Sequence, residues 1–114
     1  MILWHNQRCT KSRQALDLLE DHGIRPKIRA YLHDAPGEDE IRGVLAALRV
    51  APIDMMRPKE KVFKELGLSL DSDPDTLIKA MSKNPVLIER PILINGKRAA
   101  IGRPTENLLP LITG

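Results

Sequence analysis

The chain begins with a short apolar segment and continues with longer segments whose apolar residues recur at helical spacing. Residues 2–5 are compact, apolar and followed by polar residues, which is typical of a short buried strand. The next segment has a helical period and is followed by Gly23, a candidate helix C-terminus; its apolar residues are Ala15, Leu16, Leu18 and Leu19. Residues 24–32 then alternate, which predicts a second strand. Strand, helix and strand within about 30 residues form a βαβ unit, so we expect the two strands to be parallel.

The middle of the chain is predicted to be helical. Acidic residues at 38–40 suit the positive end of a helix, whose inward stripe would be Ile41, Val44, Leu45 and Leu48. Two prolines confine residues 53–57 to a turn or a short helix, and residues 59–66 predict another brief helix. An Asp-Pro-Asp sequence at 73–75 supplies an N-cap and a first-turn proline, so we expect a helix from there to about Lys83.

The last third of the chain returns to strands. Residues 92–94 and 97–101 predict two strands joined by Asn95-Gly96, a strong hairpin signal. A terminal helix is expected after Gly102, limited or distorted by Pro110, with its inward residues at Leu108, Leu109 and Leu111. No repeat or linker divides the chain, so we expect a single domain of residues 1–114.

Composition narrows the class of protein. A chain of 114 residues with 42% hydrophobic and 29% charged residues is ordinary for one globular domain. We expect a cytoplasmic protein, because there is no membrane-length apolar run, no secretory leader and only one cysteine. The net charge of +3 is small and the aromatic content is 3%, so nucleic acid is not an expected partner. The histidines and the cysteine show no metal-ligand spacing.

The one cysteine, Cys9, lies between the first predicted strand and the first turn of the following helix. Unpaired N–H groups and the positive end of the helix dipole favour a thiolate there. Arg8, Lys11 and Arg13 add positive charge, so we expect a pKa below the usual value of about 8.5. The alternative is a small buried hydrophobic residue, against which the polar neighbours argue. We therefore interpret Cys9 as an activated thiol.

Two further residues near the thiol have candidate roles. Ser12 stands where a Cys-x-x-Cys motif has its second thiol, and its hydroxyl either donates a hydrogen bond to the thiolate or caps backbone groups. His5 ends the first predicted strand, where we favour a structural role with an electrostatic influence on Cys9. Because no second cysteine can resolve an adduct on Cys9, turnover requires an external thiol such as glutathione.

The chain resembles the glutaredoxin-dependent arsenate reductase family over almost its whole length. Three segments carry the resemblance, in the same order and at similar spacing: His5-Asn6-Gln7-Arg8-Cys9, Met56-Arg57-Pro58-Lys59, and Glu89-Arg90-Pro91-Ile92 followed by Gly102-Arg103-Pro104. The resemblance implies a thioredoxin-like α/β fold, βαβ and ββα, with a helical insertion between the two halves. It also places Pro91 at the cis-proline position of such folds.

The resemblance implies specific roles for the residues of these segments. Cys9 would be the nucleophile that attacks arsenate, and the oxyanion would be held by Arg57, Arg90 and Arg103. The residues around the thiol correspond to His5, Ser12 and Arg13. Arginine suits a tetrahedral oxyanion because its planar fork forms paired, charge-assisted hydrogen bonds. Glutathione is the implied co-substrate and glutaredoxin the implied partner, with no bound cofactor, and we expect a monomer.

Two other functions remain open. Gln7 stands where the family commonly has proline, and Thr10-Lys11 where it often has Gly-Thr, so a glutathione-linked thiol oxidoreductase with another substrate is one alternative. The other is an Spx-like redox-responsive regulator that binds RNA polymerase. Those relatives often carry Cys-x-x-Cys, and Ser12 removes the usual disulfide switch.

Overall fold

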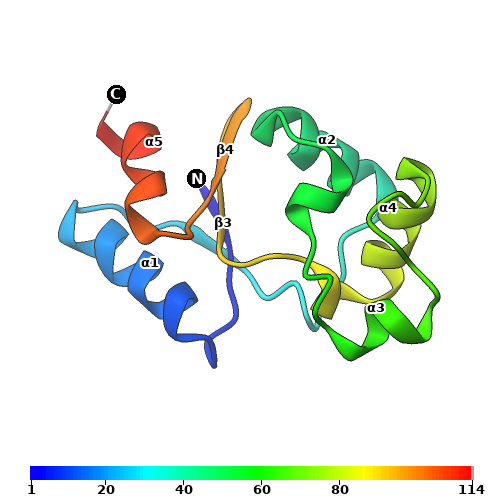
Figure 1. The fold of residues 1–114 in the computed structure, drawn as a ribbon. Helices are drawn as coiled ribbons and strands as arrows, with labels where there is room; N and C mark the ends of the chain where they lie inside the picture. The colour runs from blue at the N-terminus through cyan, green and yellow to red at the C-terminus, as the bar shows by residue number, and fades with distance from the viewer. Residues whose placement is uncertain (114) are drawn as a thin grey trace.

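The structure, a computed structural model, describes residues 1–113 and places a four-stranded sheet between two groups of helices (Figure 1). The strands are β1 (Ile2–Trp4), β2 (Lys27–Arg29), β3 (Ile92–Asn95) and β4 (Arg98–Ile101). Their order across the sheet is β2-β1-β3-β4. β1 pairs in parallel with β2 and antiparallel with β3, which pairs antiparallel with β4. These strands confirm the predicted βαβ and ββα halves.

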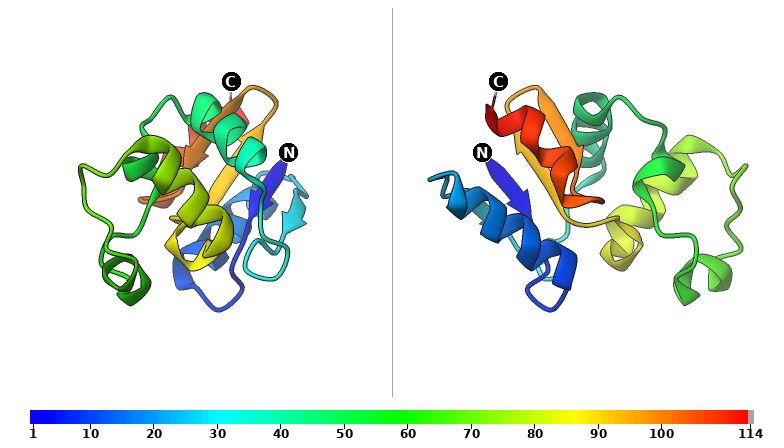
Figure 2. Two further views of the ribbon diagram at one scale, coloured as in Figure 1. Left: turned by 90° about the vertical axis from the view of Figure 1, so that its right-hand side faces the viewer. Right: turned by 60° about the vertical axis from the view of Figure 1, so that its left-hand side comes forward.

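Helices lie on both sides of the sheet (Figures 1 and 2). On one side are α1 (Thr10–Asp21), the 3-10 turn η3 (Thr105–Leu108) and α5 (Leu109–Thr113). The helical insert, on the other side, consists of α2 (Glu38–Leu48), η1 (Pro52–Met55), α3 (Lys61–Glu65), α4 (Pro74–Lys83) and η2 (Pro85–Leu87). Within residues 1–113, no helix has the length and apolar character needed to cross a membrane.

Each face of the sheet has its own apolar core, because successive strand residues point to opposite faces. Leu3 and Leu93 point into the sheet core, which also contains Ala15, Leu19, Leu108 and Leu111. Trp4 and Ile92 point the other way, into the insert core, together with buried side chains of the helical insert such as Ile41, Met55, Phe63, Ile78, Met81 and Leu87. The short strands therefore pack against both groups of helices.

The second strand is much shorter than predicted. The sequence indicated a strand over residues 24–32, but β2 contains only Lys27–Arg29. The chain turns at Ala30, whose carbonyl accepts hydrogen bonds from the N–H groups of His33 and Asp34, both at 2.9 Å. This turn leaves Leu32 38% exposed and buries Tyr31 completely. The predicted strand was too long because the alternation of apolar residues in the sequence gives no sign of the turn at Ala30.

The other predicted elements are confirmed with shifts of a few residues. Gly23 and Gly67 follow their helices with φ of +73° and +68°, a conformation that favours glycine. The side chain of Asp73 caps α4 by accepting a hydrogen bond from the Thr76 N–H at 3.4 Å. The C-terminal helix is distorted near Pro110 as expected, since a 3-10 turn over Thr105–Leu108 precedes the α-helical residues.

Candidate active site

Cys9 is the N-cap residue of α1. The loop after β1 closes with a hydrogen bond from the Cys9 N–H to the Asn6 carbonyl at 2.9 Å, and the Arg13 N–H donates to the Cys9 carbonyl at 3.0 Å. Its backbone is extended (φ −96°, ψ 124°), as is usual for an N-cap. The thiol therefore lies at the helix N-terminus, as the sequence predicted.

The thiol is buried, which corrects the expectation that polar neighbours would keep it at the surface. Cys9 is only 9% exposed, whereas Arg8, Thr10 and Lys11 are exposed to solvent. A distant residue covers it: the Nη2 atom of Arg103 lies 3.5 Å from Cys9 Sγ. Neighbours in sequence could not reveal this contact, because it comes from the other end of the chain.

The environment of Cys9 lowers its thiol pKa. Burial is the largest single influence and raises the pKa, but other interactions together outweigh it. They are the backbone N–H of Ser12, a hydrogen bond from the Arg90 side chain, the backbone N–H of Lys11 and the positive charge of Arg90. The positive charge comes from Arg90 rather than from the sequence neighbours, so two distant arginines act on the thiol: Arg103 by contact and Arg90 through the pKa.

Glu89 fixes the position of Arg103. The Nε atom of Arg103 donates to the Arg90 carbonyl at 2.6 Å and lies 3.1 Å from Oε1 of Glu89. The same carboxylate oxygen accepts the Arg90 N–H at 3.1 Å. Sequence reasoning gave Glu89 no role, although it opens the Glu-Arg-Pro segment. The structure identifies it as the residue that orients the Arg103 fork toward Cys9.

Pro91 and Gly102 bring the two arginine-bearing loops together. The Arg90–Pro91 peptide bond is cis, as the resemblance implied, and the Arg103–Pro104 bond is cis as well. The Gly102 N–H donates to the Pro91 carbonyl at 2.9 Å. A Cβ atom on Gly102 would lie 2.9 Å from Cγ of Pro91, which is too close for any larger residue without a shift. The close approach of the loops therefore depends on glycine.

Arg57 lies on the segment next to Arg90. The Arg57 N–H donates to the Leu87 carbonyl, and the Glu89 N–H donates to the Met55 carbonyl, both at 2.8 Å. The Arg57 side chain forms an ion pair with Glu60, with Nε 3.3 Å from Oε1. Among the described contacts, Arg90 and Arg103 act on Cys9, whereas Arg57 occupies the neighbouring segment.

Several buried polar atoms at this end of the sheet have no hydrogen-bond partner within residues 1–113. They are Nη1 of Arg57, Nε of Arg90, the hydroxyl of Tyr31 and Nδ1 of His5. An arginine N–H can only donate, and a buried donor without an acceptor is costly. The two arginines therefore present N–H groups that the protein itself does not satisfy, which is the arrangement expected of an anion-binding site.

The remaining predicted site residues differ in their placement. The N–H of His5 donates to the Arg29 carbonyl at 3.0 Å, and burial lowers the pKa of the His5 imidazole. Ser12 is fully buried, and its hydroxyl accepts the Asn6 N–H at 3.2 Å, which is the backbone-capping role of the two left open. Arg13 is exposed and donates to Thr10 Oγ1 at 3.3 Å.

Tyr31 also lies at this site, although sequence reasoning did not select it. Burial raises the pKa of its hydroxyl to about 12, and four charges of the site also act on it: those of Arg90, Cys9, Glu89 and Arg103. The signal that could have found it is the single tyrosine near the carboxyl end of the second predicted strand of a βαβ unit, because parallel strands end at the same edge of a sheet.

The chain is similar to known proteins over almost its whole length. The model of the ArsC family matches residues 4–111. The chain is 42% identical to an arsenate reductase of Haemophilus influenzae over 98% of both proteins. It is 39% identical to the uncharacterized protein YfgD of Escherichia coli, over 96% of this chain and 94% of that one. The solved structure of an arsenate reductase from Vibrio cholerae superimposes with a TM-score of 0.91 at 40% identity, covering 96% of this chain and 94% of that one.

Proposed function

Because the chain belongs to the ArsC family, we propose that it reduces arsenate to arsenite, with Cys9 as the nucleophile and with glutathione and glutaredoxin as the source of electrons. One observation carries the proposal: a thiol of lowered pKa lies 3.5 Å from the Arg103 guanidinium, beside unpartnered N–H donors of Arg57 and Arg90. The names of the relatives support arsenate as the anion.

In this proposal the arginines bind the oxygen atoms of arsenate. Arg90 precedes the β3–β4 hairpin and Arg103 follows it, and Arg57 lies on the segment that runs beside Leu87. Donors arranged before substrate binding stabilise negative charge with little reorganisation when the anion reacts. Glu89 holds Arg103 at 3.1 Å and so limits the movement of its fork. Arg90 also lowers the pKa of the Cys9 thiol, which favours the nucleophilic thiolate.

The proposed chemistry has two steps on the Cys9 sulfur. First, the thiolate attacks the arsenic atom, an As–O bond breaks, and the departing hydroxyl group takes a proton from solvent and leaves as water. Second, the glutathione thiolate attacks Cys9 Sγ. The S–As bond breaks with its electron pair remaining on arsenic, so As(V) becomes As(III) and the two sulfurs become a mixed disulfide. Glutaredoxin then removes the glutathione by thiol–disulfide exchange and restores the Cys9 thiol.

The need for external thiols follows from the cysteine content. The sequence has one cysteine, so the mixed disulfide on Cys9 has no internal thiol to resolve it. A groove of about 330 Å³ borders the loop that carries Cys9 and is lined on its other side by Ile28, Ala30, Leu32 and His33. This groove supports the proposal because it offers a small thiol a binding surface beside residues 5–8, which precede Cys9 in its loop.

A coupled assay tests the proposed function. The enzyme is incubated with arsenate, glutathione, glutaredoxin and glutathione reductase, and the oxidation of NADPH is followed. We expect arsenate-dependent turnover that needs both glutathione and glutaredoxin and disappears in Cys9→Ala. Turnover no higher than that of Cys9→Ala would overturn the proposal. Binding to RNA polymerase in either thiol state would instead favour the regulator.

A further inference from the structure

Tyr31 and Cys9 follow the two parallel strands of the sheet. β1 ends at Trp4 and β2 ends at Arg29, and the two strands pair in parallel from Ile2 with Lys27 to Trp4 with Arg29. Their carboxyl ends therefore meet at one edge of the sheet, which is where ligands bind in many α/β folds. The topology thus places Tyr31 at the edge from which the loop of Cys9 departs.

The packing of Tyr31 fixes its ring but leaves its hydroxyl unused. The side chain is 0% exposed and its ring stacks on Trp4, with ring centroids 6.2 Å apart and an interplanar angle of 20°. The hydroxyl oxygen is buried and has no hydrogen-bond partner within residues 1–113. Burying a hydroxyl without a partner destabilises a protein, and a phenylalanine would fill the same space without that cost. The hydroxyl therefore serves something other than the fold.

The charged groups of the candidate site influence the hydroxyl. The charges that act on it are those of Arg90, Cys9, Glu89 and Arg103, the residues that form the thiol site. With its pKa raised to about 12, the phenol keeps its proton at neutral pH and remains a donor. Two buried donors in the same group of unpartnered atoms, on Arg57 and Arg90, have the same need for an acceptor.

We propose that the Tyr31 hydroxyl is a further substrate-binding group that donates a hydrogen bond to an oxygen of the anion held by Arg90 and Arg103. The inference rests on the proposed function for its substrate class, a tetrahedral oxyanion such as arsenate. A neutral donor contributes in a way that another cation would not, because it binds an anion oxygen without adding positive charge beside the Cys9 thiolate. Tyr31 would thus complete the set of donors from the β2 side of the site.

The variant Tyr31→Phe tests this inference, because it removes only the hydroxyl and keeps the ring packed on Trp4. The measurement is the protection of Cys9 from alkylation by iodoacetamide as arsenate, phosphate or sulfate is added to the intact enzyme. A hydrogen bond to a charged group has a typical strength that corresponds to about tenfold or more in affinity. We expect the protection constant, which is the anion concentration that gives half-maximal protection of Cys9, to rise by about tenfold in Tyr31→Phe. The alkylation rate without anion should be unchanged.

Met81→Leu is the matched control, since Met81 is fully buried in the same insert core and a leucine roughly conserves its volume. It should leave the protection constant unchanged. Equal protection constants for Tyr31→Phe and the unmodified enzyme would overturn the inference, even if arsenate is reduced. The inference is also overturned if none of the three anions protects Cys9. Weaker protection of Tyr31→Phe in an enzyme that does not reduce arsenate would support the inference and overturn the proposed function alone.

Discussion

The sheet half and the helical insert contribute differently to the protein. The sheet half carries the candidate nucleophile: Cys9 is positioned by local hydrogen bonds at the start of α1. The insert packs its larger core against the opposite face of the sheet and contributes Arg57 from the segment between η1 and α3. Arg90 lies where the chain passes from the insert into β3. The thiol thus belongs to one half, whereas the arginines that we propose as its anion-binding groups come from the insert, from the passage into β3 and from the loop after β4.

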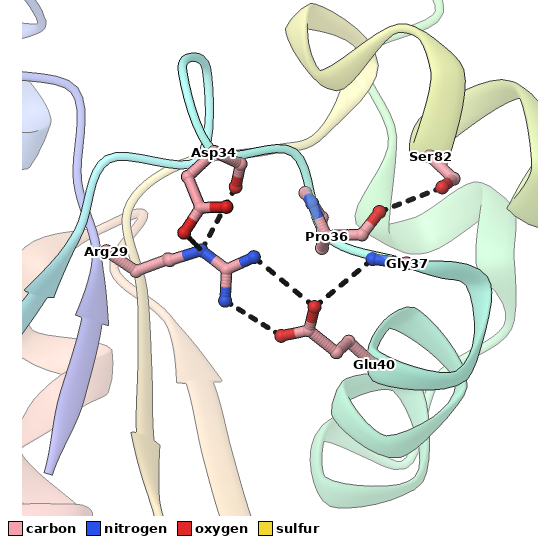
Figure 3. Close-up of polar contacts among 6 residues, drawn as sticks. All are labelled: Arg29, Asp34, Pro36, Gly37, Glu40 and Ser82. Carbon is pink, nitrogen blue, oxygen red and sulfur yellow. Dashed lines mark hydrogen bonds and ion pairs between the residues drawn. The ribbon is translucent and has the colours of Figure 1, made fainter.

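A polar cluster joins the two halves where the chain leaves β2 (Figure 3). Arg29, the last residue of β2, forms ion pairs with Asp34 at 2.9 Å and with Glu40 of α2 at 2.8 Å. Glu40 also accepts the Gly37 N–H at 3.2 Å. Ser82 of α4 donates to the Pro36 carbonyl at 2.8 Å. Figure 3 shows these groups converging on the segment between β2 and α2.

The largest effect is expected for the arginine that contacts the thiol. Arg103→Leu removes the group 3.5 Å from Cys9 Sγ, and removing one preorganised donor typically costs about 100-fold or more in rate. We expect kcat/KM for arsenate to fall by at least about 100-fold. Arg98→Leu is the control, because Arg98 is an exposed residue of the same hairpin whose side chain bonds only the Pro110 carbonyl. Similar kinetics for the two variants would show that Arg103 does not supply a binding group for arsenate.

The next effect concerns the stability of the two cores. Leu87→Ala in the insert core and Leu93→Ala in the sheet core each remove a fully buried side chain and should lower the free energy of unfolding by about 3 kcal/mol. Because β1 and β3 send side chains into both cores, we expect one cooperative transition in urea, monitored by circular dichroism and by Trp4 fluorescence. Two separate transitions in either variant would mean that the halves unfold independently.

A smaller effect is expected for the ionisation of the thiol. Arg90→Leu removes the cation that lowers the pKa of Cys9, so the pKa should rise toward its ordinary value. Below that value less of the thiol is ionised, so alkylation by iodoacetamide at neutral pH should be slower. Arg8→Leu is the control, because Arg8 adjoins Cys9 in sequence but does not contribute to its lowered pKa. If the pH dependence of the Cys9 alkylation rate shifts in Arg8→Leu and not in Arg90→Leu, the result would contradict the structure.

The smallest effect is expected for the polar cluster of Figure 3. Glu40→Gln removes an ion pair in which the Glu40 side chain is about half exposed, so the loss at pH 7 should be at most about 1 kcal/mol and should shrink in high salt. The Arg29 hydrogen bond lowers the pKa of Glu40 below 4.5, so its contribution is present above that pH and disappears as the pH falls through the folded-state value. Urea unfolding at pH 7 and pH 3 measures the difference between variant and parent. A difference that persists at pH 3 would assign the effect to another cause.

Much of the fold could be predicted from the sequence because its signals are local. The N-cap and proline that start α4, the Asn-Gly hairpin between β3 and β4 and the glycine that follows α1 each act within a few residues. The extent of β2 could not be predicted in this way. It ends because Arg29 and Ala30 bond to residues of the following turn, and a period of apolar residues carries no information about such bonds.

For the site, the sequence alone was enough to place a single thiol after β1 at a helix N-terminus. Because the sequence has one cysteine, it also predicted that an external thiol resolves any adduct on Cys9. Three features emerged only from the folded chain: Cys9 is buried, Glu89 holds Arg103 against it, and the buried Tyr31 hydroxyl, which has no partner within residues 1–113, is influenced by the charges of the same groups. The two kinds of feature differ in how far apart in the sequence the interacting residues lie. A helix terminus acts on its own residues, whereas a contact between Cys9 and Arg103 exists only after the hairpin has folded back onto β1.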